Sequence, residues 1–138
     1  EQPKYITIKL DENKQKIYGL ERINYQQEIF VVEGPIDSLF IDNSIAAAGA
    51  DLKSLRTDIN NVTYIFDNEP RNKEIVKRMY EAVERDYKIV IWPDTITQKD
   101  INEIIQSGVS KDELQTIIST NTFSKLEALT RLNAYKRI

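Results

Sequence analysis

The sequence predicts an α/β protein with a mostly parallel four-stranded sheet flanked by helices, an N-terminal β-hairpin and a C-terminal helical extension. Two observations support this fold class. Short apolar runs alternate with segments of helical periodicity, which is typical of strands joined by crossover helices. The length of 138 residues fits one domain. We therefore expect a single domain at 1–138, divided into the hairpin extension (1–25), the sheet core (28–108) and C-terminal helices (109–138).

The strands are the shortest predicted elements. The arms of the hairpin and the four strands of the main sheet are placed, in chain order, at 5–10, 16–20, 29–32, 45–48, 62–66 and 89–92.

The helices are marked by proline and by apolar spacing. Pro35 falls at a first helical position after Gly34, and Pro70 is expected to open a long helix. The apolar stripe of that long helix has helical spacing and consists of Ile75, Met79 and Val83.

Capping patterns predict the boundaries of the later helices. Ser110 and Ser124 each stand three residues before a glutamate, which is the spacing of a capping box. A helix that begins near Gln98 is expected to end at Gly108, because glycine is favoured just past a helix.

The composition excludes several kinds of chemistry. The chain has 41% apolar and 30% charged residues, as in soluble globular proteins, and it has neither cysteine nor histidine. Disulfides, thiolate or imidazole zinc sites and catalysis by either side chain are thereby excluded. The oxygen ligands that remain suit Mg²⁺, Mn²⁺ or Ca²⁺. A formal net charge of −3 argues against a uniformly basic nucleic-acid surface.

Localisation is inferred from what the sequence lacks. No apolar run approaches the roughly 20 residues of a membrane span, and the first residues do not resemble a signal peptide. We therefore expect a cytoplasmic protein with no membrane partner. Because the first residue is Glu1 rather than methionine, we also expect a piece of a longer protein.

Acidic residues follow two of the predicted strands. Glu33 and Asp37 come after the run at 29–32, and Asp67 and Glu69 come after the run at 62–66. Because the functional crevice of an open α/β sheet lies beyond the carboxyl ends of its strands, these acids are expected to converge. Two unit charges about 4 Å apart repel by roughly 4 kcal/mol near a protein surface. A bound divalent cation would relieve that repulsion.

The acidic segments resemble the motifs of a known family. Segment 33–37 reads Glu-Gly-Pro-Ile-Asp and resembles the glutamate signature of the Toprim domain; segment 67–69 reads Asp-Asn-Glu and resembles its Asp-x-Asp motif. Lys99-Asp100 resembles the downstream Lys-Asp segment of primase members, and Gly49 stands where the family has a glycine after its second strand. The amino-acid sequences of these segments are most similar to those of the DNA primases of large tailed bacteriophages.

The resemblance implies roles for individual acids. Glu33 would correspond to the catalytic glutamate, Asp67 and Glu69 would hold Mg²⁺ or Mn²⁺, and Asp37 and Asp100 would complete the metal cluster. Two ions are expected, since paired divalent ions neutralise phosphoryl charge in nucleotidyl transfer. Glu69 departs from the pattern, because most members have aspartate there. No zinc is expected in this chain.

Basic residues near the acids are candidates for nucleotide phosphates. Arg71 and Lys73 follow the second acidic segment, and Lys99 precedes Asp100. Each residue also has a purely structural alternative: the cations balance local charge, and the acids at 37, 67, 69 and 100 favour helix starts.

The resemblance implies a metal-dependent domain of a DNA primase that synthesises short RNA primers on single-stranded DNA. Its partners would be the template, ribonucleoside triphosphates, a replicative helicase and missing primase regions, in the host cytoplasm if the chain is phage-encoded. One alternative is a Toprim-type nuclease or topoisomerase-like strand-cleaving domain. Another is a non-catalytic or receiver-like module in which Asp67 accepts a phosphoryl group.

Overall fold

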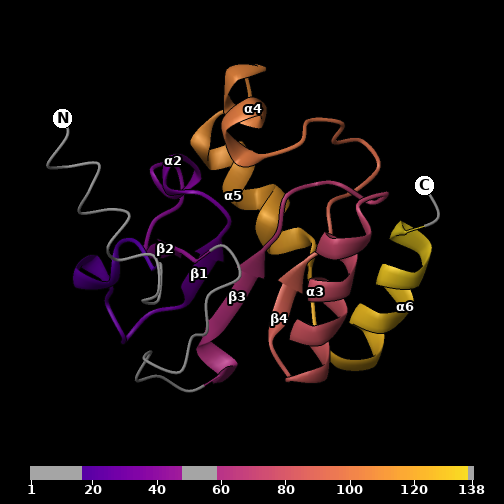
Figure 1. Ribbon diagram of the computed structural model, residues 1–138. Helices are drawn as coiled ribbons and strands as arrows, with labels where there is room; N and C mark the ends of the chain where they lie inside the picture. The colour runs from indigo at the N-terminus through magenta and orange to yellow at the C-terminus, as the bar shows by residue number, and fades with distance from the viewer. Residues whose placement is uncertain (1–16, 48–58, 137–138) are drawn as a thin grey trace, which may run out of the picture.

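The computed structural model describes residues 17–47 and 59–136 (Figure 1). It confirms an α/β fold with a mostly parallel sheet flanked by helices. The sheet has five strands in the order β2-β1-β3-β4-β5. The strands are β1 (Ile29–Val32), β2 (Ser44–Ala46), β3 (Val62–Ile65), β4 (Lys88–Val90) and β5 (Thr122–Phe123).

Four of the five strands are parallel, which places their carboxyl ends at one edge of the sheet. β1 pairs with β2 and β3, and β3 pairs with β4; Val32 lies opposite both Ala46 and Ile65. The fifth strand, β5, pairs antiparallel with β4. The prediction of four strands was therefore wrong by one edge strand, because two residues are too few to show strand alternation.

The helices cover the sheet and continue past its edge. They are α2 (Pro35–Ser38), α3 (Lys73–Glu84), α4 (Ile101–Gln106), α5 (Lys111–Thr120) and α6 (Lys125–Tyr135), with 3-10 turns at Leu20–Arg22 and Ile59–Asn61. α6 packs against α3 and β4 (Figure 1). Among the described residues, none of these helices is long and apolar enough to cross a membrane.

The core consists of two apolar clusters. The larger cluster joins the sheet to α3, α4, α5 and α6, and its fully buried side chains include Met79, Ile104 and Leu132. The smaller cluster includes Ile29 and Ile45, and it packs against partly buried residues of segment 17–23. The predicted stripe of α3 is confirmed, since Ile75, Met79 and Val83 are all buried.

Two helices begin later than the sequence predicted. α3 does not open at Pro70; it begins at Lys73, because the Asn72 side chain accepts hydrogen bonds from the backbone N–H groups of Glu74 and Ile75. α4 does not begin near Gln98, since Asp100 caps it instead. In both cases a capping side chain fixes the first turn.

The two predicted capping boxes have opposite outcomes. Ser110 forms a complete box with Glu113 at the start of α5. Ser124 makes no side-chain cap at α6, so that prediction was wrong; Lys125 next to it has a φ of 54°, which takes the backbone out of the geometry a box requires. Gly108 lies past the end of α4 with a φ of 110°, as a glycine that ends a helix should.

The predicted hairpin lies mostly outside the described residues, as does Gly49. Residues 17–20 of its second arm are described, and the prediction of a strand there was wrong, because Leu20 begins a 3-10 turn. Tyr18 alone pairs antiparallel with Ala46, through backbone hydrogen bonds of 2.8 and 3.0 Å. This isolated bridge places Tyr18 at the free edge of β2.

Candidate metal centre

Five acids from three segments of the chain lie beyond the carboxyl edge of the sheet. Burial and, after it, the negative charges of Glu33, Asp37, Asp100 and Glu69 together raise the pKa of Asp67 from 3.8 to about 7. The parallel register explains the convergence, because Glu33 and Asp67 follow neighbouring strands that end at the same level. The other four predicted acids are thus close enough to Asp67 to disfavour its ionised form.

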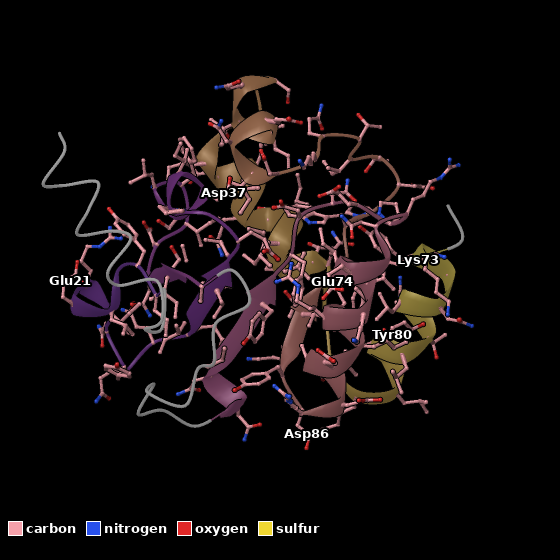
Figure 2. The ribbon with its side chains drawn as sticks, viewed as in Figure 1. Glu21, Asp37, Lys73, Glu74, Tyr80 and Asp86 are labelled. Atoms are coloured by element: carbon pink, nitrogen blue, oxygen red, sulfur yellow. The ribbon has the colours of Figure 1, made fainter. Side chains whose placement is uncertain are left out.

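Asp37 is the most buried of these acids, with 7% of its surface exposed. Its Oδ1 accepts a hydrogen bond of 3.0 Å from the backbone N–H of Asn102, which ties α2 to α4. Figure 2 shows Asp37 between α2 and the body of the molecule. Burial raises the pKa of Asp37, the Asn102 hydrogen bond lowers it, and Asp100 raises it again. The apolar neighbours Ile36 and Leu39 are each 59% exposed, so the helix turns its carboxylate inward.

Glu33 is held by a cation that the sequence did not indicate. Its Oε1 lies 3.2 Å from Nη2 of Arg78, and both side chains are largely shielded from solvent. The guanidinium carbon of Arg78 lies 5.6 Å from the centre of the Phe66 ring. Arg78 lies in α3, 45 residues from Glu33 in sequence, so only the packing of α3 on the sheet brings the two together.

Asn68, between the two acids of its segment, joins three parts of the site. Its Nδ2 donates to the backbone oxygens of Ile96 and Gln98 at 2.9 and 3.0 Å, and its backbone N–H donates to Lys99 O at 2.6 Å. The hydroxyl of Tyr135 on α6 donates to Asn68 Oδ1 at 3.0 Å. This residue therefore positions the loop that carries Lys99 and Asp100.

The end of β3 has a second fixed point. Trp92 is buried, and its Nε1 donates a hydrogen bond of 2.8 Å to the backbone oxygen of Phe66, directly before Asp67. The backbone is therefore hydrogen-bonded on either side of Asp67, at Phe66 by Trp92 and at Asn68 by Lys99.

The predicted phosphate-binding cations lie around the acids rather than among them. Lys99 Nζ lies 4.0 Å from Glu69 Oε2. Arg71 and Lys73 follow Glu69 in the turn that leads into α3. Asp100 has the structural role that the sequence left open, because it caps α4 with a hydrogen bond of 2.9 Å from Glu103 N–H.

The chemistry of the donor set fits a hard divalent cation. All five candidate ligands are carboxylates, which Mg²⁺ and Mn²⁺ prefer. As the side chains stand, no three acids in the described segments are grouped closely enough to hold an ion. Glu33 is paired with Arg78, so metal binding would require carboxylates to turn toward a shared position.

Comparison with known proteins gives one informative relative. The chain is 36% identical over 139 residues to the DNA primase of Enterobacteria phage T4. The matched region covers 98% of this chain and 40% of that primase. The chain is therefore a distant relative of a DNA primase over nearly its whole length. No family model matches it, so the resemblance to Toprim domains stays a prediction.

Proposed function

We propose that this chain is the metal-dependent nucleotidyl-transfer domain of a DNA primase, which synthesises short RNA primers on a single-stranded DNA template during replication. The observation that carries the proposal is that the negative charges of four other acids act on Asp67, which follows a strand at the carboxyl edge of the sheet. The similarity to a phage primase supports the choice of reaction. The proposed partners are the template, ribonucleoside triphosphates, a replicative helicase and the remaining primase regions.

The proposed ligands of Mg²⁺ or Mn²⁺ are Glu33, Asp67 and Glu69, with Asp37 and Asp100 completing the cluster. When bound, such ions would neutralise the charge on the phosphoryl oxygens. The chain has neither histidine nor cysteine, so a carboxylate is the group proposed to transfer the proton.

The remaining side chains orient the reactants. Glu33 would accept the proton of the attacking 3′-hydroxyl, and the Arg78 guanidinium fixes the direction of that carboxylate. Arg71, Lys73 and Lys99 lie where they can attract the triphosphate of the incoming nucleotide. Asn68 holds the loop of Lys99 against the acids, so that both parts of the site move together.

The first prediction separates metal binding from catalysis. Asp67→Asn should lower Mn²⁺ affinity at least about tenfold in calorimetric titration, because second-shell and ligand changes commonly cost about 10–100-fold. Glu33→Gln should abolish primer synthesis, measured with template and ribonucleotides, while the fold is retained. The matched control is Glu74→Gln, an exposed acid of α3 outside the site.

Either of two results would contradict the proposal. Primer synthesis that survives Glu33→Gln would remove Glu33 from the mechanism. Cleavage of supercoiled DNA without primer synthesis would assign the same acids to strand breakage instead.

A further inference from the structure

An open groove lies between α3 and the end of α6, outside the acidic site. Its volume is about 720 Å³. Cations outnumber acids on its walls: they are Arg71, Lys73, Lys77 and Lys136 against Glu81 and Glu84. The cations contributed by α3 lie in its first turns and the acids in its last turns, so the end of the groove nearest the acidic site is the basic one.

This groove adjoins a second hollow that reaches one acid of the candidate metal centre, Glu69. A second hollow, of about 520 Å³, is lined by Glu69, Pro70, Arg71 and Asn72. Pro70 and Arg71 line both hollows. A chain of phosphates could therefore pass from the acids, along Arg71, into the groove.

An aromatic side chain lies beside the cations of the groove. Tyr80 is partly exposed, and the ammonium of Lys136 lies 5.1 Å from the centre of its ring. Figure 2 shows Lys73 and Tyr80 on the side of α3 that faces α6. Cations along a groove combined with an aromatic ring are the usual means of binding single strands, because phosphates pair with the cations and a base stacks on the ring.

We propose that this groove binds the phosphate backbone of a single-stranded nucleic acid, with Lys77 and Lys136 on phosphates and a base against Tyr80. The inference rests on the proposed function, since the bound strand would lead to or from the acidic site. The acids Glu81 and Glu84 repel phosphate at the far end, so the groove holds a short stretch of strand.

The test measures binding without metal, by fluorescence anisotropy of a labelled oligothymidylate in EDTA over a range of salt concentrations. Lys77→Gln combined with Lys136→Gln should weaken binding about tenfold at low salt. It should also reduce the slope of log affinity against log salt by about 1.4, because each lost phosphate contact on a single strand contributes about 0.7.

The control variant removes the same charge elsewhere. Lys111→Gln combined with Arg131→Gln changes two exposed cations that do not line the groove. Binding by this control should stay within twofold of the unmodified chain. Equal losses in the two double variants, or no salt-dependent binding by the unmodified chain, would overturn the proposal.

Two further experiments identify the ligand of the groove. Tyr80→Phe should keep the affinity and Tyr80→Leu should lower it several-fold, since only the ring is required. Oligothymidylate and oligouridylate should compete for the groove, whereas a ribonucleoside triphosphate should compete weakly. Full competition by triphosphate alone would assign the groove to nucleotide binding and reject a strand.

The outcome can be separated from that of the proposed function. Mn²⁺ binding should be unchanged in the Lys77 and Lys136 double variant, and strand binding in EDTA should survive Asp67→Asn. If the chain fails to bind Mn²⁺ but the groove variants behave as described, the metal site is wrong and the groove stands. The reverse pattern removes the groove alone.

Discussion

At the scale of single residues, the site is a balance of negative charge. Asp67 shares its surroundings with four other carboxylates, while Glu33 is compensated by Arg78 and Glu69 lies near Lys99. Burial and, after it, the negative charge of these neighbours make the protonated form of Asp67 more favourable than in the unfolded chain. The same charge would favour a divalent cation in place of the proton.

The raised pKa of Asp67 predicts a pH dependence of metal-free stability. Since its pKa rises from 3.8 to about 7 on folding, the folded protein binds this proton more tightly, and Asp67's contribution to stability decreases as pH rises from about 4 to about 7. Thermal unfolding in EDTA should show a larger fall in midpoint over this range for the unmodified chain than for Asp67→Asn. Parallel curves for the two proteins would contradict the shift.

The contact between Arg78 and Glu33 is expected to contribute to stability. Arg78→Met should lower the free energy of unfolding by about 1.5–3 kcal/mol, the worth of a hydrogen bond to a charged group, because it leaves Glu33 unpaired. The control is Lys77→Met, at an exposed lysine of the same helix. It should change the free energy of unfolding by less than about 0.5 kcal/mol. Urea denaturation measures both.

At the scale of elements, helix starts depend on which polar side chain reaches a backbone N–H. Asn72, Asp100 and Ser110 do so, and α3, α4 and α5 begin directly after them. Ser124 has the same sequence spacing as Ser110 but no such bond. The capping box is therefore a local signal that the backbone around Lys125 overrides.

This contrast predicts different costs for two similar substitutions. Ser110→Ala should lower the free energy of unfolding by about 1 kcal/mol, the usual cost of losing a cap, whereas Ser124→Ala should be nearly neutral. Chemical denaturation of the two variants gives the comparison. Equal losses would mean that Ser124 caps α6 in solution.

At the scale of the whole molecule, the C-terminal helix supports a site formed by segments far earlier in the chain. α6 packs on α3 and β4, and its Tyr135 donates to Asn68 between the acids. Burial raises the pKa of Tyr135. The hydroxyl therefore stays protonated at neutral pH and remains a donor.

This long-range contact predicts that a change in α6 reaches the site. Tyr135→Phe should lower the free energy of unfolding by about 1 kcal/mol, the net worth of one hydrogen bond, and should weaken Mn²⁺ binding measurably. Tyr25→Phe, at a 39% exposed tyrosine, is the control. Unchanged Mn²⁺ binding in Tyr135→Phe would show that Asn68 holds its loop without help from α6.

The sequence by itself determined the fold class, the positions of the four parallel strands and the acids after two of them. Apolar alternation and parallel connection are local patterns, and they imply that the ends of β1 and β3 share an edge. For this reason Glu33, Asp37, Asp67 and Glu69 could be named before any coordinates, whereas Asp100 was named from the family resemblance. The charges of the other four acids act on Asp67, and the role of the five as metal ligands stays a prediction.

Only the tertiary structure decided how those acids are held. Arg78 meets Glu33 across 45 residues of chain, and Tyr135 meets Asn68 across 67, separations at which no sequence periodicity carries information. The edge strand β5 likewise exists only because β4 is available to pair with it. Local spacing fixes which residues face the sheet edge, whereas packing fixes which partners meet them there.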